Sequence, residues 1–221
     1  MVIPPTPIPD VATTFTYSNG SQSISYDTII TSSSYAIPAG QSLTKANIGT
    51  KVTTIGNSAF QNQSSLTEVT FEPYSILTTI EGIAFESCTN LITITIPSSV
   101  VSIATDDAFI LCTSLQSINV ESGNAIYSSD SNGVLFNLNK TELYQYPLGN
   151  SLTTYTVPNT VTTIGSSAFY FAQHLTNISI PTSVTSIGND AFGNSPSLTT
   201  INIPPLITNL GVSLFGGSTQ L

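Results

Sequence analysis

The sequence has little charge, and almost none of it is positive. Only 7% of its 221 residues are charged, against roughly 25% in an average globular domain. It has no arginine, and Lys45, Lys51 and Lys140 face 12 acidic residues, for a formal net charge of −9. A nucleic-acid binder needs basic side chains to displace counterions from phosphates, and anionic membranes attract the same side chains. We therefore expect no nucleic-acid partner and no binding to anionic membranes.

The residue types that most often build reactive sites are also scarce. The sequence has one histidine, His174, and two cysteines, Cys88 and Cys112, too few for a disulfide scaffold or a metal cluster. It contains no phosphate loop, no nucleophile elbow and no evident pair of carboxylates at a cleft. We therefore predict no catalytic residue, no cofactor and no metal site, so that the protein is not an enzyme.

Long apolar runs are missing as well. No segment approaches the roughly 20 residues of a transmembrane helix. The first ten residues, MVIPPTPIPD, lack the basic region and apolar stretch of a signal peptide. We expect no membrane insertion by this chain and see no export signal in it.

What the sequence does have is a repeat. A segment of the type V-T-T-I-G-x-x-A-F recurs, and its isoleucine-type position falls at Ile55, Ile80, Ile103, Ile164, Ile187 and Leu210. The steps between these positions are 25, 23, 61, 23 and 23 residues. A fixed period of this length is the signature of a solenoid, in which each coil covers the apolar side of the next.

A short alternating segment follows each of the first five copies, as in LITITIP from Leu91 and LTNISIP from Leu175. Alternation predicts a strand whose isoleucines face inward and whose polar residues face outward. It also predicts that Ile94, Ile178 and Ile201 form one buried ladder. The phenylalanine of each copy, such as Phe109, should sit on a short helical or 3₁₀ turn and fill the interior.

The combined pattern, LxxIxIPxSVTSIGxxAFxxCxxL, resembles the repeat of BspA-like (treponemal-type) leucine-rich-repeat surface proteins over about residues 50–221. The expected fold is a β-rich leucine-rich-repeat solenoid, a right-handed superhelix of about six coils of 23–25 residues with short helical or 3₁₀ turns. The resemblance implies a surface or secreted protein that attaches to host proteins or to other cells. It supplies no catalytic residues.

Two regions depart from the repeat. Residues 1–49, proline-rich at the start, are predicted to be an extended lead-in and an N-terminal cap. The long step of 61 residues indicates an insertion at about 121–151, where Asn132-Gly133 is typical of a hairpin turn. We expect this β-hairpin insertion to project from, or thicken, one side of the solenoid of residues 50–221.

Several single residues admit a structural interpretation. Cys88 and Cys112 each follow a repeat phenylalanine by three positions, which favours stacked core thiols, with a disulfide between coils as the alternative. His174 is interpreted as a solvated turn residue, and Asp106-Asp107 as a turn cap, with calcium as the alternative. The acceptor sequence N-x-[ST] occurs at four positions: Asn19, Asn62, Asn139 and Asn177.

The candidate binding face consists of the outward positions of the repeat strands, whose short polar side chains should form two columns. These are Glu68, Thr70, Thr93, Thr95, Ser117, Asn119, Thr154, Thr156, Asn177, Ser179, Thr200 and Asn202. Hydroxyl and amide groups suit a polar protein surface or a glycan, although the same residues could serve only as solvated strand positions. The predicted function is therefore adhesion to a protein or glycan partner at a cell surface or after secretion. The alternatives are self-assembly in a cell surface, filament or virus particle and, ranked last, ice binding by threonine ladders.

Overall fold

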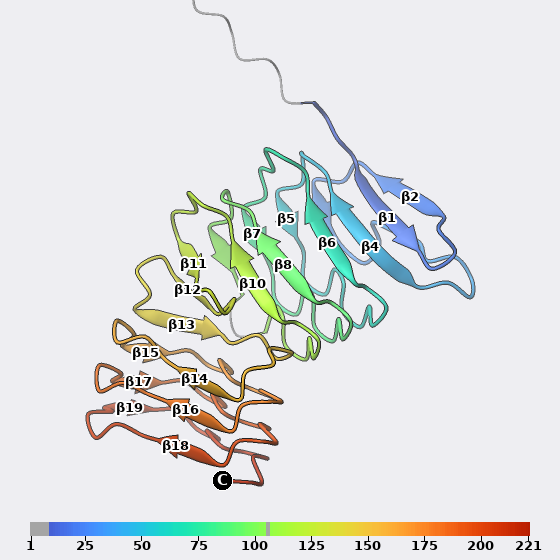
Figure 1. Ribbon diagram of the computed structural model, residues 1–221. Coiled ribbons are helices and arrows are strands. Elements are labelled where there is room, and N and C mark those ends of the chain that lie inside the picture. The colour runs from blue at the N-terminus through green and yellow to red at the C-terminus, as the bar shows by residue number, and fades with distance from the viewer. Residues whose placement is uncertain (1–8, 105–106) are drawn as a thin grey trace, which may run out of the picture.

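The computed structural model describes residues 9–104 and 107–221, which form a solenoid of strands and turns (Figure 1). Residues 1–8, which belong to the expected lead-in at residues 1–10, and Asp106 lie outside the described residues. Within them there is no α-helix or 3₁₀-helix, so the predicted short helical turns are hydrogen-bonded turns instead. The chain makes about eight turns rather than six, because two coils lack the repeat motif that the sequence pattern detects.

The front wall of the solenoid is built from the alternating segments. Its repeat strands are β4 (Leu43–Ile48), β6 (Glu68–Phe71), β8 (Thr93–Ile96), β10 (Ser117–Val120), β14 (Thr154–Thr156), β16 (Asn177–Ser179) and β18 (Thr200–Asn202). Neighbours pair in parallel within three groups, β4 with β6, β8 with β10, and β14 with β16 and β18. Ile178 pairs with Ile201, but Ile94 pairs with Ile118 in another group. The predicted single isoleucine ladder is thus interrupted.

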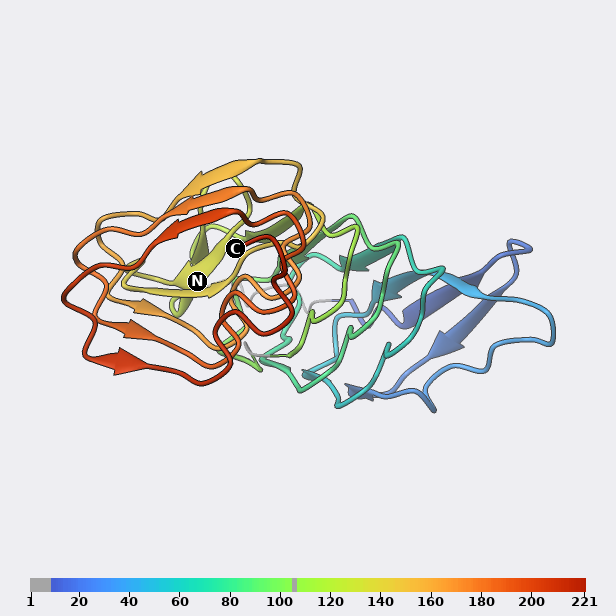
Figure 2. The ribbon, with the colours of Figure 1, turned by 90° about the horizontal axis from the view of Figure 1, so that it is seen from below.

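The second wall carries the isoleucine of each repeat motif in a two-residue strand. One ladder joins β3 (Ile29–Ile30), β5 (Thr54–Ile55), β7 (Thr79–Ile80) and β9 (Ser102–Ile103). Another contains β15 (Thr163–Ile164), β17 (Ser186–Ile187) and β19 (Asn209–Leu210). Figure 2 shows the coils lying one behind another along both walls.

Threonines beside these strands hold one coil to the next. The Thr176 hydroxyl donates to the Thr153 carbonyl at 3.0 Å, and Thr199 donates to Thr176 at 3.1 Å. On the second wall, Thr78 donates to the carbonyl of Thr53 at 3.1 Å. Much of the threonine content is therefore structural, and these residues are distinct from the outward threonines of the front wall.

The third wall is a stack of turns that contain the Ala-Phe pair. Backbone hydrogen bonds join equivalent turns, as from the amide of Phe60 to the carbonyl of Ala84 at 2.7 Å. Residues in the left-handed region recur at fixed positions, among them Ser58, Ile83 and Ser167, with φ of 56°, 47° and 54°. A branched side chain is costly in this region, so Ile83 is a strained position in an otherwise regular wall.

Two stacks of aromatic rings fill the interior. Phe60, Phe85 and Phe109 follow one another with centroids 5.2 and 5.5 Å apart, and the burial predicted for Phe109 is confirmed, with 1% of its surface exposed. The second stack runs through Phe169, also fully buried as predicted, to Phe192 and Phe215. Tyrosines begin both stacks: Tyr35 lies against Phe60, and Tyr146 lies against Phe169.

An antiparallel hairpin covers the first coil. Its strands are β1 (Thr13–Tyr17) and β2 (Gln22–Ser25), and β1 also pairs with β4. Phe15 is fully buried, and its ring lies 4.8 Å from that of Tyr35. The hairpin thus closes the apolar interior at this end, and the coils behind it begin before residue 50, with β4 already in parallel register.

The insertion lies in line with the array. Its strands are β11 (Tyr127–Ser129), β12 (Leu135–Asn137) and β13 (Glu142–Gln145). β12 pairs antiparallel with both β11 and β13, and β13 then pairs in parallel with β15. Tyr127 and Leu135 belong to the apolar cluster of the first half, whereas Phe136 and Tyr146 belong to that of the second. The segment therefore does not project from the rod, because its apolar residues join the two halves.

Candidate binding face

The candidate face lies on the outward side of the front wall. Eleven of its twelve residues are exposed, and Ser117 is half-buried. Alternation along each strand produces this arrangement: in β8, Thr93 and Thr95 point outward while Ile94 and Ile96 are buried. The inward and outward assignment of these strands by the sequence pattern therefore matches the structure.

The face is divided into three parts rather than two continuous columns. Glu68 and Thr70 lie on β6, Thr93 and Thr95 face Ser117 and Asn119 on the β8–β10 pair, and the other six residues lie on β14, β16 and β18. The insertion separates β10 from β14. Strand periodicity could not predict these breaks, because it fixes which way a side chain points but not whether adjacent strands pair.

The face also extends to residues that the sequence pattern missed. On β4, Lys45 stands opposite Glu68 and Asn47 opposite Thr70. The Thr70 hydroxyl donates to Asn47 Oδ1 at 3.0 Å, and Asn47 Nδ2 donates to Glu72 Oε1 at 2.6 Å. The alternation in LTKANI indicates a strand of the same kind. It was missed because no repeat motif comes before this segment in the sequence.

Hydrogen bonding is unequal across the face. Thr93 and Ser117 hydroxyls lie 2.8 Å apart, and Asn119 Nδ2 donates to Thr93 Oγ1 at 3.2 Å. Six other polar side chains make no hydrogen bond to any described residue: Thr95, Thr154, Thr156, Asn177, Ser179 and Asn202. Their donors and acceptors are free to meet a partner.

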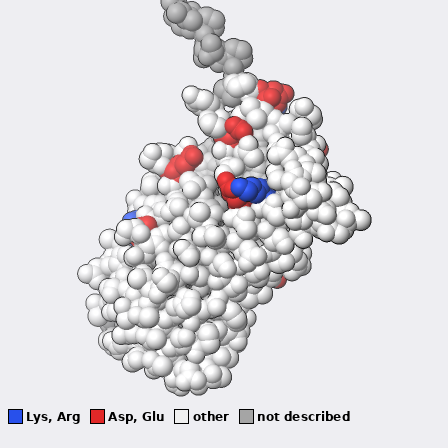
Figure 3. Space-filling model, turned by 45° about the vertical axis from the view of Figure 1, so that its right-hand side comes forward, with Lys and Arg blue, Asp and Glu red and all other residues white. Residues whose placement is uncertain are grey.

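Charge is concentrated toward the N-terminal half. Lys45 Nζ and Glu68 Oε2 form an ion pair of 2.7 Å on the face itself. After Glu142, the only charged side chain is Asp190. Figure 3 accordingly shows acidic and basic atoms gathered in the part nearer the N-terminus and an uncharged surface beyond it. The face thus joins a charged portion over β4 and β6 to a neutral portion over β14–β18.

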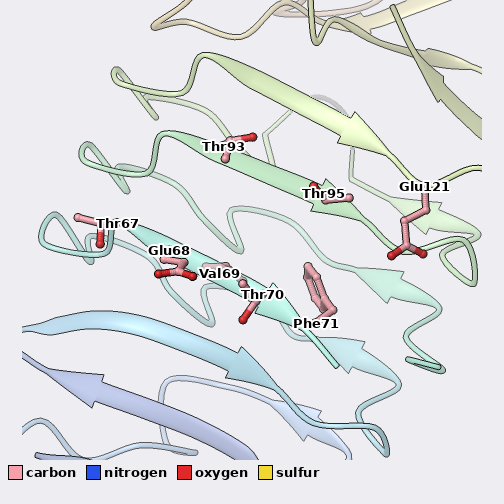
Figure 4. A pocket seen from close by; sticks show the side chains of 8 residues that line it. All are labelled: Thr67, Glu68, Val69, Thr70, Phe71, Thr93, Thr95 and Glu121. Atoms are coloured by element: carbon pink, nitrogen blue, oxygen red, sulfur yellow. The ribbon is translucent and has the colours of Figure 1, made fainter. Parts of the chain in front are cut away.

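A hollow of about 390 Å³ opens on the face between β6 and β8. Thr67, Glu68, Val69, Thr70 and Phe71 line one side, and Thr93, Thr95 and Glu121 line the other (Figure 4). Glu121 Oε2 accepts a hydrogen bond from the amide of Ser98 at 2.8 Å. This is the place where hydroxyl, carboxylate and aromatic groups converge.

The two cysteines belong to the core. Both are fully buried and free, and no disulfide joins them. Cys88 Sγ donates to the Phe60 carbonyl at 3.1 Å, and Cys112 Sγ donates to that of Phe85 at 3.0 Å. The thiol of Cys112 and burial raise the pKa of Cys88, which makes a nucleophilic thiolate unfavourable. Ser195 occupies the equivalent position two coils from the end and donates to Phe169 at 2.9 Å.

His174 and the aspartates at turns also have local roles. His174 is exposed and borders a surface hollow with Gln116 and Gly149. Asp107 accepts a hydrogen bond from the amide of Ile83 at 3.3 Å. Asp130 binds the amides of Asn132 and Val134 at its own turn. In residues 9–104 and 107–221, no three His, Cys, Asp or Glu side chains are grouped as a metal ion would require.

None of the described segments is a helix long and apolar enough to cross a membrane.

Comparison with known protein families shows which family the chain resembles. The BspA type leucine rich repeat region matches residues 28–145 and 141–221, in six copies. Among curated proteins, no match was found.

Solved structures of bacterial leucine-rich-repeat proteins are similar to the chain. The pneumococcal vaccine antigen PcpA superposes with a TM-score of 0.68 at 28% identity, over 81% of this chain and 49% of that one. A leucine-rich repeat protein from Eubacterium ventriosum gives 0.69 at 30% identity, over 80% and 52%. A leucine rich cell surface protein from Faecalibacterium prausnitzii gives 0.66 at 32% identity, over 81% and 46%.

The chain spans about half the length of these three proteins. The family match, in contrast, extends over most of the chain and includes both halves of the solenoid. Repeat motif, coil geometry and sequence match therefore agree, and the chain belongs to the BspA-type leucine-rich-repeat family.

Proposed function

We propose that this protein is a non-enzymatic surface or secreted protein that binds a protein or glycan partner through the outward face of its front wall. The observation that carries the proposal is the set of exposed polar side chains on this face whose hydrogen-bonding groups have no partner in the described chain. A binding surface needs such groups, whereas a structural ladder would use them internally, as the threonines between coils do.

Because the side chains of the face are short, a partner that covers them causes only a small loss of conformational entropy. Threonine, serine and asparagine lose less rotamer entropy on immobilisation than lysine, arginine or glutamate. Their strands are fixed by buried isoleucines, so the groups are already positioned before a partner arrives. Pre-organisation of this kind favours specific recognition of a polar surface.

The family supports the cellular part of the proposal. The solved relative from Faecalibacterium prausnitzii is described as a cell surface protein, and we extend that location to this chain as part of the proposal. Surface labelling of intact cells that produce the protein would test it directly. Labelling only after lysis would contradict a surface location.

The binding face is tested by replacing Thr95, Asn119 and Thr156 together with lysine. All three are exposed, so circular dichroism should show an unchanged fold. Binding to the surface from which the native protein is recovered should fall at least tenfold, because lysine adds length and charge where the partner packs. The matched control places three lysines at exposed positions on or beside the strands of the second wall: Ser102, Thr185 and Asn209. Equal binding by both variants would exclude the front wall as the site.

A further inference from the structure

The front wall is broken between β6 and β8. The strands before and after the break pair in parallel register, Ala46 with Val69 and Ile94 with Ile118. Among the described residues no register joins β6 to β8, although the second wall continues past this level through Ile55, Ile80 and Ile103. The coils therefore stay stacked at the back while their front edges separate.

The turn that follows β6 accounts for the separation. Eleven positions lead from Val69 on the front wall to Ile80 on the second, against nine from Ile94 to Ile103. The extra residues fall in the turn around Tyr74, which has a φ of 66°. A longer turn lets β6 shift relative to β8 without breaking the second wall, and the break is thus built into the sequence of this coil.

The break leaves backbone groups available beside polar side chains. Along a parallel strand, alternate residues direct their N–H and C=O groups to opposite sides. Those of β6 and β8 that would meet in a continuous sheet face the hollow instead. Thr95 adds a hydroxyl that has no partner in the described chain, and the half-buried ring of Phe71 adds an apolar surface. The volume of about 390 Å³ is within the range of ligand sites.

Of the two carboxylates that line the hollow, Glu68 has an ionic partner and Glu121 has only a neutral hydrogen-bond donor. Glu68 pairs with Lys45 at 2.7 Å, and Glu121 accepts the amide of Ser98 at 2.8 Å. The site therefore offers strong hydrogen-bond acceptors and one carboxylate charge, that of Glu121, which is not ion-paired within the described residues. A neutral ligand rich in hydroxyl groups can donate to Glu121 and leave the Lys45–Glu68 pair in place, whereas a cationic side chain would compete with Lys45 for Glu68.

A second hollow of about 370 Å³ adjoins the first over β1, β4 and β6, and Glu68 and Thr70 line both. Lys45 and Gln22 add donors to it. The two hollows thus lie next to each other on the N-terminal part of the face, and together, called the trough below, they suit a ligand of more than one ring.

We propose that this trough binds a neutral oligosaccharide, with one sugar ring against Phe71 and between Thr95 and Glu121. The sugar ring places its apolar face against Phe71. Its hydroxyls donate to the Glu121 carboxylate and exchange hydrogen bonds with the threonines and with the unpaired backbone groups of β6 and β8. The inference rests on the proposed function and deepens it, because it assigns the partner class and the part of the face that binds it.

The test uses the full chain and a panel of immobilised neutral di- and trisaccharides, followed by titration calorimetry with the best soluble sugar. Thr95→Tyr fills the hollow, and Ser179→Tyr is the matched control, at an exposed outward position on β16. Glu121→Gln can still accept the Ser98 amide but loses its charge-assisted hydrogen bonds. We expect Thr95→Tyr to abolish sugar binding, Glu121→Gln to weaken it roughly tenfold or more, and Ser179→Tyr to leave it unchanged.

Absence of binding to every sugar of the panel would overturn the inference, as would equal loss in Thr95→Tyr and Ser179→Tyr. Binding of an oligolysine peptide in place of sugars, reduced by Glu121→Gln, would assign the trough to a basic peptide and would also overturn it. The proposed function is judged separately. If Thr95→Tyr leaves attachment to the native surface intact while the triple lysine variant loses it, the proposed function stands but the native partner does not bind through the trough, which overturns the inference.

Discussion

Truncating one ring of the second aromatic stack tests how the solenoid is held together. Phe169 is fully buried, with Tyr146 and Phe192 stacked at centroid distances of 5.4 and 5.5 Å. Loss of a buried phenylalanine side chain costs about 3–5 kcal/mol, including about 0.5–1.5 kcal/mol for each aromatic pair. For a chain of this size, Phe169→Ala should lower the melting temperature by about 6–20 °C.

Phe215 is the internal control, since it lies in the same stack but contacts one ring, that of Phe192, at 5.7 Å, and is only half-buried. Phe215→Ala should cost less than half as much as Phe169→Ala. Urea unfolding followed by circular dichroism measures both. Similar costs for the two variants, or an unchanged melting temperature for Phe169→Ala, would mean that the stack does not stabilise the coils as we argue.

Three further changes test separate parts of the structure. Cys88→Ser should change the free energy of unfolding by less than about 1 kcal/mol, because Ser195 makes the same hydrogen bond in its own coil, whereas Cys88→Val removes the donor, adds bulk and should cost about 1–3 kcal/mol in urea unfolding. Clean deletion of residues 121–151 should abolish the single cooperative transition, since this segment fills both apolar clusters; a folded deletion variant would show that the halves can join without it. Burial, followed by the hydrogen bond to Asp130, raises the pKa of Tyr155. The unfolded state then releases a proton near pH 10 that the folded state retains at this residue, so its contribution to stability is complete below about pH 10 and falls as pH rises; an equal loss of stability above about pH 10 in the wild type and in Tyr155→Phe would contradict this.

Much of the fold is predictable from the sequence because one physical rule repeats. The alternation in LITITIP fixes Ile94 as buried and Thr95 as exposed, and the fixed spacing of Phe85 and Phe109 places their rings in one stack. Burial and exposure follow from the local periodicity of the sequence, and the same periodicity recurs in each repeat that carries the motif.

The coils that lack the motif were missed for the same reason. Tyr35 and Tyr146 take the place of the repeat phenylalanine, but without the surrounding I-G-x-x-A-F pattern nothing local marks them. The role of the insertion depends on contacts between segments distant in sequence, such as Tyr127 Oη with the amide of Ile103 at 2.8 Å. A pattern of alternating residues carries no information about such contacts.

For the candidate site, only the outward orientation of the side chains could be predicted from the sequence. The sequence pattern assigned Thr95 and Glu68 to one outward surface, but it did not indicate that β6 and β8 separate or that Glu121 joins them at a hollow. The separation follows from the longer turn around Tyr74. A longer turn could interrupt strand pairing in either wall, and the sequence does not indicate which. In this coil the second wall remains paired at Ile80, and the interruption falls between β6 and β8 of the front wall.

Amide hydrogen exchange of the chain, with and without the surface component that it binds, shows directly which wall of the solenoid the partner covers. Binding through the front wall should slow exchange in peptides containing β6, β8, β10 and β14. Peptides of the second wall, such as that containing β9, should exchange at unchanged rates. Protection confined to the second wall or to the Ala-Phe turns would contradict the claim that the outward polar face is the binding surface.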